Sequence, residues 1–341
     1  MKRILIVRTD RVGDVVMMTP MIRELRRTFP DAFIVTLTQP YAKSILLHNP
    51  HLDLALTDDL RKETFWSCVK ELRQYRFTDG LLLMPTERAA YQMFFAGISN
   101  RIGVGRKLYE VITFMKSVSR KNYTPLRHEA DYCMDLARRI GVRTENVTPE
   151  VFISDRERGD VTEFLQSRGV TDEDYRIIVH TSSGGSAPNW SEAKYLALLK
   201  TMLKEFSELR MKILLTAREM SDGFRNVIRS FGGNTFIDLS QDLHDLRDLI
   251  KVIAKANLYI GASTGPIHLA DALNIRCIGL HCHRPMNCIQ HWGVLNGRSI
   301  NLEISDPYCR SHCSKDQTRC AFEDGIGMDE VLAAVKSFMD H

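Results

Sequence analysis

Short aliphatic runs recur along the chain, and the stretches between them place apolar residues at helical spacing. We predict buried strands at 4–7, 33–37, 54–56, 81–84, 177–179, 213–215, 258–260 and 277–280. After the first run, one helical face carries Val15, Met18, Thr19, Ile22, Leu25 and Phe29. Unbroken apolar strands that alternate with amphipathic helices are typical of parallel sheets covered on both faces. The pattern therefore predicts an α/β protein.

The alternation occurs in two blocks, as expected for a chain of 341 residues. The first block ends after a helical segment at 128–141, and a polar stretch at 154–174 leads to the next strand. We predict one domain over residues 1–160 and a second over residues 172–328. Residues 329–341 are predicted to form a terminal helix that packs back on the first domain.

Composition narrows the class of protein. Hydrophobic residues at 44% and charged residues at 26% match a globular protein, and no run of eighteen apolar residues predicts a membrane span. The first apolar run is too short for a signal peptide, so we expect a cytoplasmic protein with reduced thiols or a metal site. Residues 1–150 hold 24 Lys and Arg against 17 Asp and Glu, which favours an anionic partner for this half. We expect no nucleic-acid partner.

The segment RTDRVGDVVMMTP, residues 8–20, follows the first predicted strand. Ligands of parallel α/β sheets bind beyond the carboxyl ends of the strands, so these residues are candidates for chemistry. Gly13 is expected to allow a tight turn, and Asp14 then lies in the first helical turn, where its carboxylate could act as a general base. Alternatively, Asp14 only caps its helix, and Asp10 is placed for either task. Arg8 and Arg11 are candidates for acceptor or phosphate contacts.

Two further loops follow strands of the second block. In GASTGPIHLADAL, residues 261–273, two hydroxyls and a glycine precede a helix that begins with proline, which predicts a phosphate site at the helix N-terminus. In HTSSGGSAPNW, residues 180–190, hydroxyls and paired glycines predict a second anion-binding loop. Two such loops in one domain favour a nucleotide diphosphate as the ligand.

Five motifs follow one another along nearly the whole chain. They are the segment 4–38, the pair His128-Glu129 at a helix start, SGGSAPNW at 183–190, STGPIHLADAL at 263–273 and HWGVL at 291–295. In this order they resemble the heptosyltransferase family of bacterial lipopolysaccharide synthesis. The resemblance implies a GT-B fold, in which two Rossmann-like domains face each other across a cleft. It also implies transfer from ADP-heptose with inversion and without a metal, to a lipopolysaccharide core or related glycan.

The resemblance assigns roles to individual positions. Asp14 is the expected base that deprotonates the acceptor hydroxyl. The expected donor-binding residues are Ser182, Ser183, Asn189, Glu219, Ser263, Thr264, Gly265 and His268. The expected acceptor-binding residues are Arg8, Asp10, Arg11, Gly13 and Arg120.

The sequence also departs from the family pattern. Pro188 stands where the family usually has Lys, and Ser263 replaces an Asp found in many members before Thr-Gly-Pro. Another nucleotide sugar is therefore an alternative to ADP-heptose. Residues 101–127 are rich in Lys and Arg and contain aromatic residues, which suits a phosphorylated, acylated acceptor met at the inner face of the membrane. Alternatively, this segment is a solvated charged face.

The C-terminal region is rich in cysteine. Cys288, Cys309, Cys313 and Cys320 lie near histidines, but their spacing is not that of a zinc ribbon with two CxxC pairs. Free thiols are the leading interpretation, and a structural zinc or iron site is the alternative. Two other functions stay open here: a nucleotide-sugar 2-epimerase, and a non-catalytic partner of an assembly complex stapled by metal.

Overall fold

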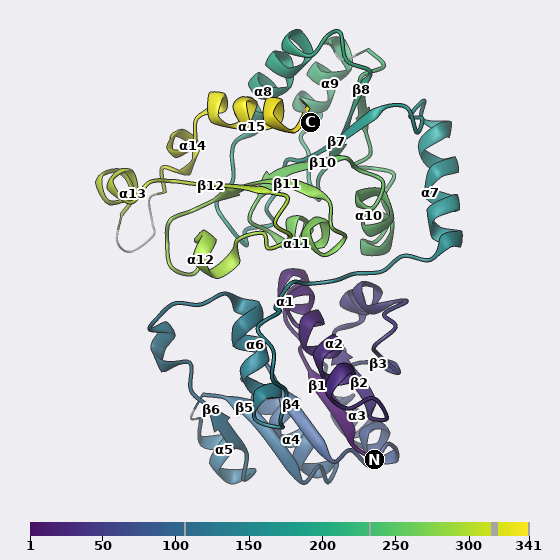
Figure 1. Ribbon diagram of the computed structural model, residues 1–341, viewed down its shortest axis with the longest axis vertical. Helices are drawn as coiled ribbons and strands as arrows, with labels where there is room; N and C mark the ends of the chain where they lie inside the picture. The colour runs from purple at the N-terminus through teal and green to yellow at the C-terminus, as the bar shows by residue number, and fades with distance from the viewer. Residues whose placement is uncertain (106, 232, 315–319, 340–341) are drawn as a thin grey trace. The chain divides into compact units, whose positions relative to one another are not determined.

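The computed structural model describes residues 1–105, 107–231, 233–314 and 320–339. The chain divides into two compact units, residues 1–152 and residues 153 onward. Each unit is a six-stranded parallel sheet with helices on both faces (Figure 1). Within the described ranges, no helix combines the length and apolar character that a membrane crossing requires.

The first unit contains the sheet β3-β2-β1-β4-β5-β6. Its strands are β1 (Arg3–Val7), β2 (Phe33–Thr38), β3 (Leu54–Thr57), β4 (Asp79–Leu82), β5 (Asn100–Val104) and β6 (Lys116–Val118). All neighbouring strands are parallel. The aliphatic run Ile4–Val7 is fully buried because β1 lies inside the sheet with helices over both of its faces.

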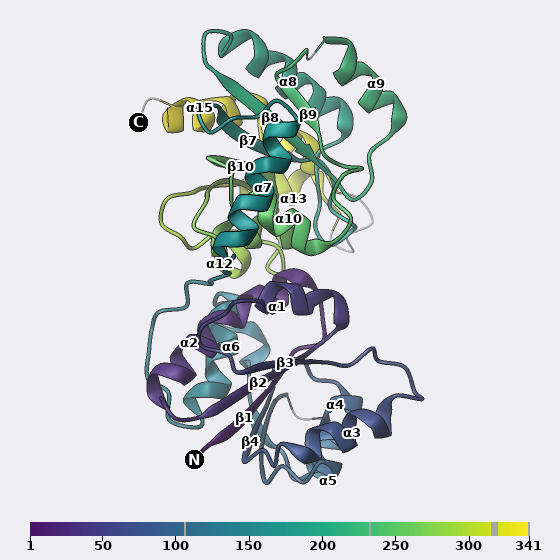
Figure 2. The ribbon, with the colours of Figure 1, turned by 90° about the vertical axis from the view of Figure 1, so that its right-hand side faces the viewer.

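Helices cover both faces of this sheet (Figure 2). They are α1 (Val12–Met17), α2 (Thr19–Thr28), α3 (Phe65–Gln74), α4 (Glu87–Phe95), α5 (Leu108–Ile112) and α6 (Glu129–Arg138), with the 3₁₀ turns η1 (Pro40–Leu46) and η2 (Lys121–Tyr123). Helices α1 and α2 contact α6 on one face, while α4 contacts both α3 and α5 on the other.

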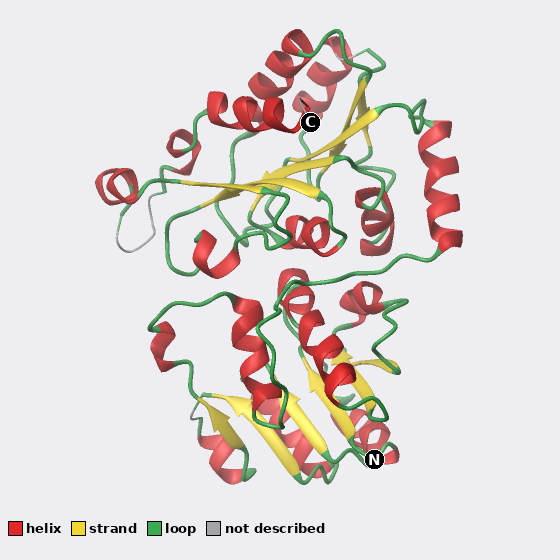
Figure 3. Cartoon of the chain, in the orientation of Figure 1, coloured by secondary structure: helices red, strands yellow, loops and turns green. Residues whose placement is uncertain are grey.

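The second unit repeats the plan with the sheet β12-β11-β10-β7-β8-β9 (Figure 3). Its strands are β7 (Tyr175–His180), β8 (Met211–Thr216), β9 (Phe236–Asp238), β10 (Leu258–Ala262), β11 (Arg276–His281) and β12 (Ile300–Glu303). Its helices are α7 (Asp155–Ser167), α8 (Glu192–Glu205), α9 (Asp222–Phe231), α10 (Leu246–Ile253), α11 (Gly265–Ala272), α12 (Ile289–Trp292), α13 (Asp306–His312), α14 (Phe322–Gly325) and α15 (Met328–Met339).

Strand order reverses once in each sheet. In the first unit the chain starts at β1, builds outward through β2 and β3, and then returns to add β4 on the other side of β1. In the second unit the same reversal separates β7 from β10. Such switch points leave a crevice at the carboxyl ends of the two strands, where ligands of open α/β sheets bind. The fold therefore marks the ends of β1 and β4, and of β7 and β10.

All eight predicted strands are present, and four further strands were not predicted. Strands β6, β9 and β12 lie at sheet edges, and β5 lies next to an edge. These strands are short or carry polar residues, as in the sequence KSV of β6, because an edge strand is not buried on all sides. An apolar-run criterion therefore misses them.

The helix predicted after the first strand is broken into two. Pro20 cannot donate to the carbonyl of Val16, and the Thr19 hydroxyl donates to that oxygen instead at 2.7 Å. Helix α1 therefore ends at Met17, and α2 begins at Thr19. The predicted apolar face survives the break, since Val15, Ile22 and Leu25 are fully buried.

The division between the units lies earlier than predicted. The polar stretch after residue 154 is helix α7, which starts at a capping box formed by Ser154 and Glu157. Arg247 donates to both Glu157 oxygens at 2.7 Å and ties α7 to α10 of the second unit. The boundary is therefore at 152/153 and not at residue 160.

The prediction that the terminal helix packs back on the first domain is wrong. Helix α15 contacts α8, β11 and β12 of the second unit. Its buried residues, including Val331 and Val335, belong to the same apolar core as Leu198 and Ile278. The helix completes the cover of that sheet because its apolar stripe matches the face beside α8.

Candidate active site

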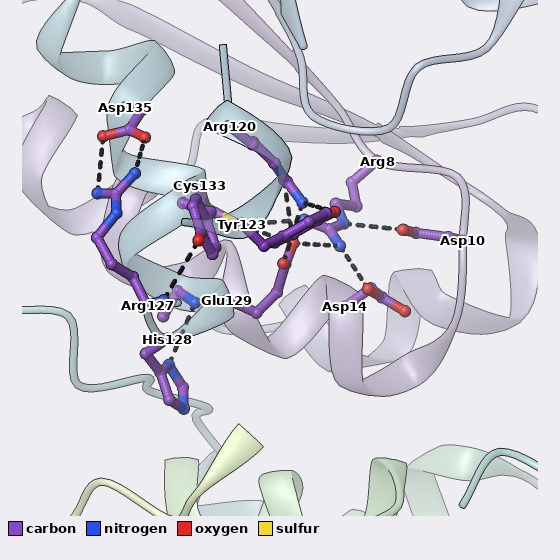
Figure 4. A network of polar contacts seen from close by, with 12 residues as sticks. Arg8, Asp10, Asp14, Arg120, Tyr123, Arg127, His128, Glu129, Cys133 and Asp135 are labelled. Carbon is purple, nitrogen blue, oxygen red and sulfur yellow. Dashed lines mark hydrogen bonds and ion pairs between the residues drawn. The ribbon is translucent and has the colours of Figure 1, made fainter. Parts of the chain in front are cut away.

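Arg8, at the carboxyl end of β1, is the centre of a buried ionic network (Figure 4). Its Nε donates to both oxygens of Asp10, at 2.9 and 3.1 Å. Nη1 donates to Glu129 Oε1 at 3.0 Å, and Nη2 donates to Glu129 and to Asp14. The Arg8 side chain is only 3% exposed and is engaged by these carboxylates. Its predicted contact with an acceptor stays a prediction.

Glu129 connects this network to Arg120. Nη1 and Nη2 of Arg120 donate to the Glu129 carboxylate, at 3.1 and 3.2 Å. Arg120 also donates to the Tyr123 hydroxyl and lies over the Tyr132 ring, 5.1 Å from its centre. Three acids and two arginines leave the cluster with a net charge of −1 when all are ionised. The predicted acceptor contact of Arg120 is therefore limited to what this pairing leaves exposed, 13% of its side chain.

Asp14 does not cap its helix. The N-cap of α1 is Arg11, without a side-chain capping bond, and the Asp14 carboxylate pairs with Arg8 in the first helical turn. Only one Asp14 oxygen is paired; in the described part of the chain the other has no hydrogen-bond partner (Figure 4). The side chain is 19% exposed and is not sealed in the interior. Asp14 therefore retains an accessible oxygen that can accept a proton.

Asp10 is bound more completely. Both of its oxygens accept from Arg8, and its side chain is 13% exposed. Burial raises the pKa of Asp10 to about 6 against the attraction of Arg8, and the charge of Asp14 adds to the rise. Geometry therefore favours Asp14 over Asp10 as the carboxylate that meets a substrate.

The two remaining residues of this segment have plain structural positions. Gly13 lies buried inside α1 and does not form the turn that we predicted between strand and helix. Arg11 is exposed at the start of the helix. Of the predicted acceptor-binding residues, Arg11 is the one whose side chain stands in solvent.

Two buried threonines mark the switch point of the second unit. Thr181 follows β7, and Thr264 follows β10, the adjacent strand in the sheet. Both hydroxyls are buried, and neither has a hydrogen-bond partner among the described residues. A buried hydroxyl without a partner costs free energy unless another group reaches it. Thr264 is also the N-cap of α11 without a side-chain capping bond, and the amide of Gly265, the first residue of that helix, lies directly after it.

The loop after β7 is built around two left-handed glycines. Gly184 and Gly185 have φ of +52° and +73°, which side-chain-bearing residues rarely adopt. Ser182 Oγ accepts from the backbone amide of Arg218, at the end of β8, at 2.8 Å. Next to the loop, burial lowers the pKa of His180 to about 4, so its ring is neutral at pH 7. The loop therefore presents hydroxyls and backbone without a carboxylate of its own.

Arg218 lies beside this loop and was not among the residues that the sequence singled out. Its side chain is exposed and lies over Gly184, where a Cβ would come within 3.9 Å of Arg218 Nη1. In the described ranges it forms no ion pair with a carboxylate. Pro188 is half-buried and has no charge. Arg218, which follows β8, therefore places a cation beside this loop, a position that local sequence spacing cannot show.

Some of the other predicted donor-binding residues stabilise the loop after β7, and others are exposed. Asn189 donates to the Thr181 carbonyl at 2.9 Å and accepts from Tyr195 at 2.7 Å, so it holds the loop in place. Ser183 accepts from the Gly185 amide, and Glu219 is exposed beside Arg218. Asn189 is the one whose amide is fully engaged by the protein.

Helix α11 is anchored by buried polar groups. His268 is 2% exposed, and its ring lies 5.3 Å from that of Trp292, so a direct phosphate contact stays a prediction. One turn later, Asp271 accepts from the amides of Leu295 and Asn296 at 3.0 and 2.8 Å. Burial raises the pKa of Asp271 to about 7. These contacts fix the HWGVL motif against the helix whose N-terminus borders Thr264.

The cysteines are free thiols. Cys288 is buried, Cys309 and Cys313 are half-buried, and Cys320 is exposed. Over the residues for which coordinates are described, which exclude 315–319, no three His, Cys, Asp or Glu side chains are grouped as metal ligands. A zinc or iron site stays a prediction.

Comparison with known proteins assigns this geometry to a family. The family model for glycosyltransferase family 9 (heptosyltransferase) matches residues 65–318. A putative glycosyltransferase of Haemophilus influenzae is 25% identical over 347 residues, which cover 99% of this chain and 97% of that protein. The family model begins after the segment that contains Asp14, whereas this relative covers it.

Solved structures extend the similarity to the whole fold. A family 9 glycosyl transferase from Veillonella parvula gives a TM-score of 0.83 at 19% identity, with 99% of this chain and 97% of that chain covered. The Escherichia coli ADP-heptose lps heptosyltransferase II gives 0.77 at 17% identity, with 99% and 98% covered. The E. coli heptosyltransferase WaaC with ADP gives 0.72 at 12% identity, with 98% and 99% covered. The predicted GT-B class, built from two Rossmann-like units, is confirmed.

Proposed function

Because the chain belongs to glycosyltransferase family 9, we propose that it transfers heptose from ADP-heptose to a lipopolysaccharide core or related glycan, with Asp14 as general base. Membership makes the protein a transferase, so the alternative of a non-catalytic assembly partner is wrong. The observation that carries the role of Asp14 is its unpaired, accessible oxygen at the switch point of the first sheet.

The acceptor side of the reaction depends on the Arg8 network. Asp14 removes the proton of the acceptor hydroxyl as that oxygen attacks the anomeric carbon, and the bond from that carbon to the diphosphate oxygen breaks on the opposite face. Arg8 fixes one Asp14 oxygen and leaves the other for the proton. Glu129, held by Arg120, fixes Arg8 in turn, so the base is oriented through two layers of ion pairs.

The donor side depends on neutral donors and one arginine. The diphosphate leaving group gains negative charge as the bond breaks, and prearranged N–H, O–H and cationic groups stabilise that charge. The hydroxyls of Thr181 and Thr264 and the start of α11 would supply the neutral donors. Arg218 would supply the positive charge, which supports transfer without a metal. Ser182, Ser183, Gly265, Glu219 and His268 remain predicted donor residues.

A nucleotide sugar other than ADP-heptose is the alternative donor. Pro188 and Ser263 both depart from the family pattern and both lie on loops of the proposed donor site. A nucleotide sugar other than ADP-heptose would use the same Asp14 chemistry with a different fit around these loops. The acceptor would be met at the inner face of the membrane, where lipid-linked glycans are presented.

The test combines ligand binding with transfer. We expect ADP to raise the melting temperature more than UDP, GDP or CMP do, since a ligand that binds only the folded state stabilises it. With ADP-heptose and a lipopolysaccharide core acceptor, Asp14→Asn should reduce kcat by roughly 10² to 10⁴ while ADP binding is retained. Asp10→Asn is the matched control, because it changes a neighbouring carboxylate of the same cluster.

Each arm has an outcome that contradicts the proposal. Retained turnover in Asp14→Asn, with loss in Asp10→Asn, would transfer the role of base to Asp10. A preference for UDP or GDP would reject ADP-heptose and leave the family assignment intact.

A further inference from the structure

Large apolar side chains are exposed on one side of the first unit, over helices α3, α4 and α5. They are Trp66, Phe95, Leu108, Val111, Ile112 and Phe114. Both ribbon views place these three helices on the same side of the sheet, and α4 contacts the other two (Figures 1 and 2). We call these six side chains the apolar surface. Exposed apolar residues gathered in one place are uncommon on a soluble monomer and indicate an interaction site.

Helix α5 directs its apolar residues outward. Leu108, Val111 and Ile112 are spaced as one helical face and are 76%, 72% and 50% exposed. The polar residue between them, Glu110, is buried, and its carboxylate accepts from the Lys107 amide and the Ser117 hydroxyl. An ordinary surface helix shows the reverse arrangement, with its acidic residue in solvent. The sequence of α5 is therefore built to present an apolar face.

Contacts join the parts of this surface. The rings of Trp66 and Phe95 have their centres 5.2 Å apart, which links α3 to α4. Arg101 lies over the Phe94 ring at 5.2 Å and donates to the Thr113 carbonyl, which links α4 to the turn after α5. That turn carries Phe114, which is 80% exposed.

The segment that carries α5 is mainly basic, although the exposed Glu87 of α4 lies near Tyr109. Residues 101–127 contain seven Lys and Arg and a single acid, Glu110, which is buried. Lys107 and Lys116 are exposed next to the apolar residues, and Lys116 donates to an amide oxygen of Asn100 and so keeps its charge unpaired by a carboxylate. Apolar side chains next to exposed lysines complement a bilayer with anionic headgroups. Pairing this surface with a second copy of itself about a two-fold axis would bring like charges together.

We propose that the apolar surface binds anionic phospholipid bilayers, with the α5 side chains and Phe114 in the interfacial layer and Lys107 and Lys116 at the headgroups. The binding needs no nucleotide sugar, and it rests on the proposed function only for its purpose, since a lipid-linked acceptor would be met there. It gives the acceptor-binding unit a fixed side toward the membrane.

The test is sedimentation of the full chain with vesicles, without donor or acceptor. We expect binding to phosphatidylglycerol–phosphatidylethanolamine vesicles, weaker binding as salt rises, and little binding to phosphatidylcholine. Leu108→Ser/Phe114→Ser should weaken binding roughly tenfold or more, and Lys107→Gln/Lys116→Gln roughly fivefold per lysine. Leu209→Ser/Val227→Ser is the matched control, because both side chains are exposed apolar residues of the second unit.

The outcomes separate this proposal from the enzymatic one. Equal vesicle binding by wild type and Leu108→Ser/Phe114→Ser, or no binding by either, would reject the surface. A wild-type dimer in analytical ultracentrifugation that the same variant abolishes would assign the surface to self-association instead. Transfer to a delipidated acceptor should be unchanged in this variant, so loss of membrane binding and failure of the transferase proposal are measured separately.

Discussion

Replacing Arg8 should destabilise the first unit strongly, because one buried cation serves three carboxylates. In Arg8→Met the side-chain volume is kept, but Asp10, Asp14 and Glu129 lose their shared partner. Only Arg120 remains in the cluster, so its net charge would change from −1 to −2. Removing one partner of a buried pair costs about 3–5 kcal/mol, since the remaining charge stays desolvated.

The pH dependence of this loss follows from Asp10. Its pKa is raised to about 6 with Arg8 present, and removal of the arginine takes away an attraction that lowers it. Below that pH Asp10 becomes neutral, so the variant should lose less stability at about pH 5 than at about pH 8. Urea unfolding at both pH values measures the difference, and hydrogen exchange of β1 and α6 peptides shows whether it is confined to the first unit.

Arg11→Met is the matched control, because Arg11 is exposed on the same segment. Its unfolding free energy should change by less than about 0.5 kcal/mol. A loss below about 1 kcal/mol in Arg8→Met at neutral pH, or the same loss at both pH values, would refute the description of Arg8 as the partner of buried, ionised carboxylates.

Other measurements test the site from different directions. Since burial raises the pKa of Asp10, the wild type should lose stability as pH rises from about 4 to about 6, and Asp10→Asn should lack that change; a Tm series that falls equally in both would contradict it. Arg218→Gln should weaken ADP binding by roughly tenfold and Arg218→Lys by less, measured by calorimetry, and unchanged binding in both would remove the arginine from the donor site. Burial raises the pKa of Cys133 to about 12, so in native protein iodoacetamide should label the exposed Cys320 first and leave Cys133 unmodified, as mass spectrometry can check.

The sequence predicted the parts of the fold that hydrophobicity controls. The eight apolar strands and helices such as α6 appear where apolar periodicity placed them, and seven of these strands lie inside their sheets, where burial on both faces demands apolar residues. The edge strand β6 and helix α7 were not predicted because their residues are mostly polar. Contacts with neighbouring elements stabilise them, as the Glu157–Arg247 ion pair does for α7. Such pairs join residues 90 positions apart, which periodicity does not reveal.

The sequence predicted where the candidate site lies but not which side chains pair with each other in it. Asp14, Thr264 and the loop at 182–185 lie at switch points, because motifs at strand ends follow the topology of the sheet. The pairing of Arg8 with Glu129 was not predicted because the two residues are 121 positions apart. Arg218 was missed for the same reason, since its place over Gly184 arises from the pairing of β7 with β8.

The buried hydroxyls of Thr181 and Thr264, which have no hydrogen-bond partner among the described residues, have a consequence for evolution and engineering. Valine has almost the same shape and no group to desolvate, so a population selected for heat resistance alone should drift toward valine at both positions. If related proteins keep threonine at both positions, the hydroxyls are selected because a substrate binds them. An alignment of orthologues tests this without an assay.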